Sequence, residues 1–384
     1  MHTITFIAGL LLILATLVDG FETILLPRRV NHRFRYSRLY YRSSWRLWRR
    51  TAAALFDGRW REAMLSAFGP LSLLGLFGSW VTSLILGFAS LQWSVGSLSS
   101  GSEQAGNLKS FTSYLYFSGT TYFTLGLGDV LPATASSRAL TVIEGGVGFG
   151  FLAVIISYLP ILYQAFSRRE VAISLMDARA GSPPTAGQFL LRLERGGRIE
   201  VDNATLLEWE RWCAELLESQ ISFPVLAFYR SQHANQSWLA ALTAMLDSCS
   251  LLLSLLPADE SHQAQLTFAM ARHAAVDITL IFGIRAPKSP EARTPRADPI
   301  RFRNLLTQLA GPANDADKIE RRFSELRGLY EPFLDALAAR FVLVLPPVIH
   351  PERADDNWQR SAWMPRTPGI GRLPSADSSN DHFG

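Results

Sequence analysis

Three long apolar runs divide the first half of the chain and predict three membrane-spanning helices. They cover residues 4–26, 70–91 and 138–166, and each reaches the roughly 20 residues that a helix needs to cross a bilayer. The first run is not typical of a signal peptide, because no basic residue precedes it and arginines, not a small-residue cleavage site, follow it. We therefore expect residues 1–27 to contain a transmembrane helix.

The segment between the first two runs, residues 28–68, is rich in arginine and aromatic residues. From Arg28 to Glu62 it holds eleven arginines and two acids. Arginine with aromatics can indicate nucleic-acid binding, but between two spanning helices it favours a cytoplasmic loop that follows the positive-inside rule. An amphipathic helix on anionic lipid is compatible with this interpretation, and we predict no nucleic-acid partner.

The distribution of charge then sets the expected topology. Arg168 and Arg169 follow the third run, so both basic clusters lie on one side. This places the N-terminus outside, the polar segment 92–109 outside as a turret, and the C-terminal half in the cytoplasm. A multi-pass protein of the cell membrane, in bacteria the inner membrane, is the expected location. The two cysteines, Cys213 and Cys249, predict neither a disulfide framework nor a zinc site and fit a reduced compartment.

The second half predicts a helical cytosolic domain over residues 168–345. Amphipathic or apolar helices are expected over 205–220, 237–256, 261–282, 300–309 and 315–344, with Asn203 capping the first. Two of these are apolar enough to leave a fourth and a fifth span as the alternative. His273 and Asp277 lie one turn apart, with His262 and Glu260 nearby, but a metal site there is disfavoured against ordinary hydrogen bonding. Residues 346–384 are expected to be disordered.

Candidate chemistry is concentrated in a short stretch before the third run, Thr124, Leu125, Gly126, Leu127, Gly128 and Asp129. Glycines at alternate positions allow a strand of alternating left- and right-handed residues, which points successive carbonyls to one side. Four such strands around an axis would form rings of oxygen atoms that replace the water around a cation. A pore helix over 110–123 would precede this stretch, with Ser110 as its cap.

This stretch resembles the Thr-Val-Gly-Tyr-Gly-Asp selectivity filter of potassium channels. The resemblance covers a pore domain over 69–167, with an outer helix (70–91), pore helix (110–123), filter (124–129) and inner helix (138–166). It implies a homotetramer in the lipid bilayer, potassium as the permeant ion, and no other metal or cofactor. It also places a gating hinge at Gly148, to which Pro160 adds a second bending point.

The sequence departs from the family pattern at the filter. Leu127 replaces the usual aromatic residue, Phe123 replaces a threonine, and Thr120 stands where some relatives have a carboxylate. The resemblance therefore implies that potassium preference survives in a softer form. Glu144 is expected to form hydrogen bonds behind the filter. Asp19 and Glu22 are expected near the headgroups as partners of Arg28 or Arg29, or alternatively against the pore helices.

These patterns predict an all-α membrane protein, with a tetrameric potassium-channel-like pore and a helical cytosolic domain. The expected function is passive, potassium-selective conduction, with weak selectivity left open. The alternative is a membrane-anchored signalling or scaffold protein on a degenerate channel fold. No catalytic constellation is found, so an enzyme is not predicted. No motif in the sequence identifies the gating stimulus or a cytosolic regulator.

Overall fold

The computed structural model describes the chain over most of its length and divides it into two compact units, Met1–Gln164 and Ala165–Gly384. The described residues are 2–26, 35–95, 98–100, 108, 110–195, 198–200, 202–231, 236–285, 299–310 and 316–349. Arg28, Arg29 and most of the expected turret lie outside them, as does the expected disordered tail from residue 350 onward.

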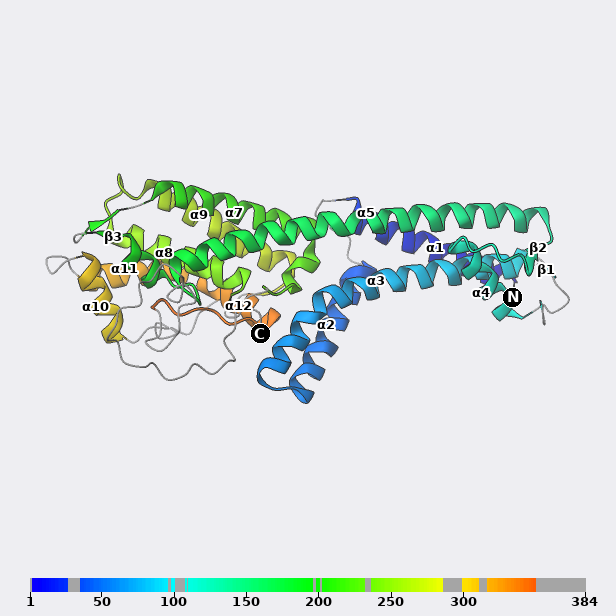
Figure 1. Cartoon of the computed structure of the whole chain (residues 1–384), viewed down its shortest axis with the longest axis horizontal. Coiled ribbons are helices and arrows are strands. Elements are labelled where there is room, and N and C mark those ends of the chain that lie inside the picture. The colour runs from blue at the N-terminus through cyan, green and yellow to red at the C-terminus, as the bar shows by residue number, and fades with distance from the viewer. Residues whose placement is uncertain are drawn as a thin grey trace, which may run out of the picture. The chain divides into compact units, whose positions relative to one another are not determined.

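The first unit is built from long helices with one small pair of strands (Figure 1). Its elements are α1 (His2–Ile24), α2 (Tyr36–Leu55), α3 (Gly58–Val95), β1 (Leu98–Ser100), α4 (Phe111–Tyr122), β2 (Val130–Pro132) and the first part of α5 (Ala135–Ala180). Helix α1 packs along α3 at two glycines: a Cβ atom on Gly9 would lie 2.8 Å from the Gly87 carbonyl oxygen. Small residues at this crossing therefore let the two backbones approach closely.

Helix α3 is longer than the expected outer helix. It begins at Gly58, so residues 58–68 are helical, and Pro70 lies inside the helix and not at its start. Proline removes one backbone hydrogen bond and bends a helix without necessarily ending it. Figure 1 shows α3 bending, so that its first turns and α2 leave the axis of the other helices. The predicted arginine-rich loop is thus largely a helical hairpin of α2 and the start of α3.

Helix α5 also exceeds the predicted inner helix, 138–166, and extends from Ala135 to Ala180. It stays α-helical through both Gly148 and Pro160. Its buried residues follow the helical period, which leaves one face packed and the others open. The part from residue 165 onward belongs to the second unit.

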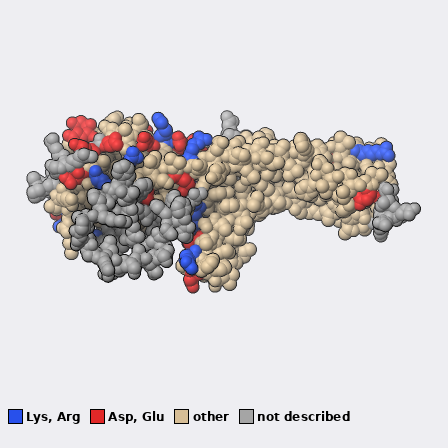
Figure 2. All heavy atoms as spheres, viewed as in Figure 1, with Lys and Arg blue, Asp and Glu red and all other residues tan. Residues whose placement is uncertain are grey.

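Within the described residues, four helices are long and apolar enough to cross a membrane: α1, α3, α5 and α8 (Trp238–Leu255). The first three expose many apolar side chains. On the face seen in Figure 2, the surface along the long helices of the first unit shows almost no charged atoms except near the two ends of these helices. Helix α8 differs, because every residue from Trp238 to Leu253 is buried by the other helices of its unit. This burial favours a core helix over a fourth span.

The second unit is a helical bundle around α8. The other elements are α6 (Ala186–Leu193), β3 (Glu194–Arg195), β4 (Arg198–Ile199), α7 (Asn203–Ser222), η1 (Pro224–Phe228), α9 (His262–Ile281), α10 (Pro299–Ala310), α11 (Ala316–Gly328) and α12 (Glu331–Phe341). Helix α8 contacts α6, α9, α11 and α12. On α7 the exposed face is charged, with Glu208, Arg211, Glu215 and Glu218, which suits a surface in water.

Three expectations for this unit were wrong in detail. The cap of α7 is Asp202, whose carboxylate accepts from the backbone N–H groups of Ala204 and Thr205, so α7 begins at Asn203. The single helix expected over 315–344 is two helices, because the chain turns after Gly328 and α12 begins at Glu331 with Pro332 in its first turn. The start of the tail is packed, since Val348 is buried and its carbonyl accepts from the Gly187 N–H.

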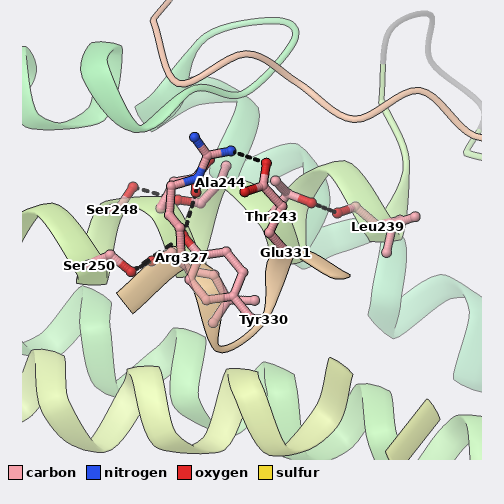
Figure 3. Close-up of polar contacts among 10 residues, drawn as sticks. Leu239, Thr243, Ala244, Ser248, Ser250, Arg327, Tyr330 and Glu331 are labelled. Atoms are coloured by element: carbon pink, nitrogen blue, oxygen red, sulfur yellow. Dashed lines mark hydrogen bonds and ion pairs between the residues drawn. The ribbon is translucent and has the colours of Figure 1, made fainter. Parts of the chain in front are cut away.

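A buried polar cluster joins α8 to the chain around α11 and α12 (Figure 3). The Tyr330 hydroxyl donates to Asp247 Oδ1 at 2.5 Å, and Arg327 Nε lies 3.5 Å from the same oxygen. Arg327 also donates to Glu331 at 2.7 Å. Burial and the Asp247 carboxylate raise the pKa of Tyr330 well above its ordinary value, so the proton stays on the tyrosine.

Candidate functional site

Helix α4 leads directly into the 124–129 stretch. Ser110 caps the helix, because its side chain accepts from the Ser113 N–H. At the other end, Thr124 N donates to Thr121 O at 3.0 Å and Leu125 N donates to Thr120 O at 2.8 Å. These bonds use the last carbonyls of α4 and fix the direction in which the following residues leave the helix.

The 124–129 stretch has positive φ at alternate residues. The φ angle is 54° at Thr124, 56° at Gly126 and 77° at Gly128. Alternation of left-handed and extended or right-handed residues turns successive carbonyls toward one side of the strand. Glycine was expected to allow a positive φ at positions 126 and 128, but nothing in the sequence indicates the positive φ of Thr124. A positive φ at a non-glycine residue such as Thr124 is strained and marks candidate functional positions.

The stretch is open to its surroundings in the single chain. Residues 123–128 are all exposed, and the apolar side chains of Phe123, Leu125 and Leu127 are 47–62% exposed. A Cβ atom on Gly126 or Gly128 would meet no atom within 4 Å. Phe123, Leu125 and Leu127 therefore present three apolar side chains at alternate positions of an exposed loop.

A tyrosine of α4 holds the C-terminal end of the stretch. The Tyr116 hydroxyl donates to Asp129 Oδ2 at 2.8 Å. This bond raises the pKa of Tyr116, with smaller contributions from desolvation and from the Asp129 charge. The contact was not predicted from the sequence, although Tyr116 and Asp129 are only 13 residues apart and a short helix could bring them together. It supplies a restraint between α4 and the loop that Leu127 and Thr120 do not provide.

Two short strands frame the same end. β1 pairs antiparallel with β2, with Leu98 opposite Pro132 and Ser100 opposite Val130. Leu98 and Val130 pack with Tyr114 and Phe117 of α4 in one apolar cluster. The strand pairing was not predicted, because three-residue strands leave little periodicity in a sequence. It ties the segment after Asp129 to the chain just after the end of α3.

Glu144 of α5 lies fully buried behind the stretch. The Ser118 hydroxyl carries one proton, yet the Ile85 carbonyl oxygen, at 2.9 Å, and Glu144 Oε1 both lie within hydrogen-bonding distance of it. Both contacts are hydrogen bonds when the carboxyl holds a proton and donates to Ser118, while Ser118 donates to Ile85. One hydroxyl thus joins α3, α4 and α5. Among the described residues, Glu144 Oε2 has no hydrogen-bond partner.

Gly148 of α5 is a close-contact position. A Cβ atom there would lie 2.5 Å from the Tyr122 carbonyl oxygen at the end of α4. Gly145, Gly146 and Gly150 have open space instead. The contact gives Gly148 a packing role beside the 124–129 stretch, whether or not the helix also bends there.

Asp19 binds residues of α2 and α3, while Arg28 and Arg29, the partners first expected for it, lie outside the described residues. Its carboxylate is buried and accepts from Trp80 Nε1 of α3 at 2.9 Å and from the Ser37 N–H of α2 at 3.2 Å. The alternative, a contact to the helices of the pore unit, therefore describes it. Glu22 lies 3.6 Å from Arg35 Nε. A carboxylate at the first turn of α2 also interacts favourably with the helix dipole.

The other candidate chemistry is weak. His273 Nε2 lies 3.7 Å from Asp277 Oδ2. In the described part of the chain, no three His, Cys, Asp or Glu residues lie together in a way that could hold a metal ion. Cys213 and Cys249 are both buried and reduced.

Comparison with known proteins agrees with this geometry. Residues 76–165 match a family model described as "ion channel", a range that starts inside α3 and includes α4, the 124–129 stretch and all of the first-unit part of α5. No curated protein and no solved structure matches the chain. Within this range, the short helix α4 and the exposed 124–129 stretch lie between two helices that are long and apolar enough to cross a membrane. Residues 76–165 are therefore similar to an ion channel domain of the potassium-channel-like type.

Proposed function

We propose that the protein is a passive, potassium-preferring channel whose filter is formed by residues 124–129. The observation that carries this proposal is the alternation of positive φ at Thr124, Gly126 and Gly128 within the family-matched segment. Carbonyl oxygens on one side of a strand replace the hydration shell of a cation without a net charge in the pore. Asp129 adds negative charge at the outer mouth and attracts cations.

Four copies are needed, because one strand provides only one side of a carbonyl ring. Two exposed apolar surfaces support assembly. One is the loop with Phe123, Leu125 and Leu127. The other is a stripe on α5 at seven-residue intervals, Val142, Phe149, Ile156 and Tyr163, each 65–76% exposed. A seven-residue repeat of apolar side chains is typical of helices that pack against other helices.

The selectivity is expected to be softer than in relatives with an aromatic residue at the position of Leu127. Leucine has no hydroxyl and cannot bond to the pore helix. The Tyr116–Asp129 bond compensates only at the outer end. Potassium preference therefore persists with measurable sodium leak.

Flux through the purified protein in liposomes tests the proposal. Gly126→Ala is expected to abolish potassium flux, since a φ of 56° costs a residue with a Cβ atom about 1–2 kcal/mol and the carbonyl would leave the ring. Gly78→Ala is a matched control, because that glycine of α3 also has open space around it but lies in a helix. Folded tetramers without any flux would favour the membrane-anchored scaffold instead.

Reversal potentials test the softness of the selectivity. In mixed potassium and sodium, Leu127→Tyr is expected to reduce the sodium leak relative to the native protein. Equal and stringent selectivity in both would show that the missing hydroxyl has no effect.

We further infer that the N-terminus lies outside and that the second unit regulates the pore from the cytoplasm. Helix α5 supports this, since it continues without a break into the second unit, where Arg169 donates to the Leu226 and Tyr229 carbonyls. Labelling a cysteine at Ser99, but not at Ser43, from outside tests the sidedness. Removing the second unit is expected to change open probability and leave selectivity in place.

A further inference from the structure

Helix α2 has one packed side and one open side. Trp45 lies 2% exposed with its ring 4.8 Å from that of Phe68, and Trp48 Nε1 donates to the Met64 carbonyl at 2.8 Å. Both contacts are to the first part of α3. They fix which side of α2 faces the protein and which side faces its surroundings.

The open side carries a row of arginines. Arg38, Arg42, Arg46 and Arg50 occur at every fourth position, and all four are exposed. We call them the arginine stripe. Helix α2 contains no acidic residue, and none of the four has an acidic partner among the described residues. Four uncompensated positive charges on three turns of helix need anionic groups outside the chain.

Apolar side chains border the arginine stripe. Leu39 and Leu47 are 62% and 67% exposed, and Tyr36 is also exposed. Tyr36 and Leu47 are eleven residues apart, which is about three full turns, so they share one edge of the open side. A cationic edge beside an apolar edge is typical of a helix that lies in the membrane interface, with arginines at the phosphates and leucines below them.

The position of α2 in the chain places it at the membrane boundary. Only Phe56 and Asp57 separate it from α3, and Asp19 near the end of α1 binds its first turn through Ser37. Both neighbours are helices that can span the bilayer. The arginine stripe therefore lies where a spanning helix leaves the bilayer, within reach of lipid headgroups.

We propose that α2 is an interfacial arm whose arginine stripe binds the phosphate groups of anionic lipids. The inference rests on the membrane fold and not on ion conduction. Nucleic acid is the disfavoured occupant, because the exposed Leu39 and Leu47 beside the stripe cannot stack on bases, and Trp45 is buried against Phe68. Charge complementarity and the exposed leucines together fit an anionic bilayer surface.

A spin label on the apolar edge tests the proposal. The full chain with Leu47→Cys is labelled, which is selective because Cys213 and Cys249 are buried, and placed in nanodiscs. One set of discs contains phosphatidylcholine alone, and the other also contains phosphatidylserine. Collision of the spin label with oxygen and with a water-soluble paramagnetic relaxation agent reports whether the arm lies in the bilayer. Both sides of a nanodisc are open to water, so the measurement gives the same result whichever leaflet α2 contacts.

The variant Arg38/Arg42/Arg46/Arg50→Gln removes the charge of the stripe from exposed positions. The matched control, Arg272/Arg321/Arg322→Gln, neutralises three exposed arginines of the second unit. Each stripe arginine is expected to contribute about five-fold to the partition of the arm into the anionic surface. Circular dichroism verifies that the variants remain helical.

The expected result is a label that enters the bilayer in discs with phosphatidylserine, returns to water in the stripe variant, and is unaffected in the control. A label that is equally exposed to water in both lipids would overturn the proposal. So would equal insertion in the native protein and the stripe variant, because phosphate binding would then contribute nothing. Displacement of the arm from anionic discs by a short RNA at low micromolar concentration would overturn it in favour of nucleic acid.

Discussion

Replacing Gly148 by alanine separates a packing role of this glycine from a hinge role. The new Cβ atom would lie 2.5 Å from the Tyr122 carbonyl oxygen and 3.1 Å from the Tyr122 ring. Real Cβ contacts do not occur below about 3 Å, and the first of these atoms belongs to the backbone. Either α5 or the end of α4 must therefore shift, and α4 leads directly into the 124–129 segment.

The magnitude follows from two opposing terms. Alanine in a helix interior is more favourable than glycine by about 0.5–1 kcal/mol. Overpacking a close contact costs about 1–3 kcal/mol. The net loss is on the order of 1–2 kcal/mol, which changes an equilibrium by about 5–30-fold. We expect this loss to appear as a smaller fraction of channels with an intact filter.

Gly146→Ala and Gly150→Ala are the matched controls. Both lie in the same helix, and a Cβ atom at either would meet nothing within 4 Å in the single chain. Alanine at either position gains helix propensity without a steric clash. Melting in mild detergent and potassium flux in liposomes are measured on all three variants. The melting temperature and the flux should fall for Gly148→Ala and stay level or rise for the controls.

Two results would refute this reasoning. Equal melting temperatures and equal flux in Gly148→Ala and the controls would show that the contact with Tyr122 does not constrain the pore. A change in open fraction alone, at unchanged melting temperature and selectivity, would assign Gly148 to the hinge role.

Three further predictions concern single hydrogen-bonding groups. Tyr116→Phe removes the bond to Asp129 and should speed the loss of conduction in recordings over time. Asp129→Asn keeps an acceptor for the Tyr116 hydroxyl and should show the same effect more weakly. Tyr330→Phe leaves the buried Asp247 without its shortest partner and should cost about 1–3 kcal/mol, seen as earlier melting of the second unit by circular dichroism. Hydrogen bonds from Thr205 hold the pKa of Asp202 below its ordinary value. The stabilisation of α7 by the Asp202 carboxylate is therefore present at neutral pH and should be lost on acidification below the ordinary carboxyl range. A helical signal that is as acid-resistant in Asp202→Ala as in the native chain would contradict this.

The order of apolar and polar segments determined the architecture of this protein from the sequence alone. Run length predicts spanning helices, because a helix in lipid must satisfy its own backbone and present apolar side chains over a fixed thickness. The paired glycines, Gly126 and Gly128, marked a place where the backbone adopts positive φ angles. Helices of the second unit followed in the same way from their periodicity. The family match to residues 76–165 agrees with this part of the analysis.

Tertiary structure decided which side chains meet. The partners of Asp19, Ser118 and Tyr116 lie on other helices or beyond a loop, and no sequence spacing specifies such a contact. Helix ends were also set by packing: α3 continues through Pro70 and α5 through Pro160, because neighbouring contacts outweigh the loss of one backbone bond. Local propensity acts within a few residues, whereas burial and hydrogen bonding across helices depend on the whole fold. For that reason the sequence alone could identify the glycines of the 124–129 segment but not the tyrosine and serine that hold it.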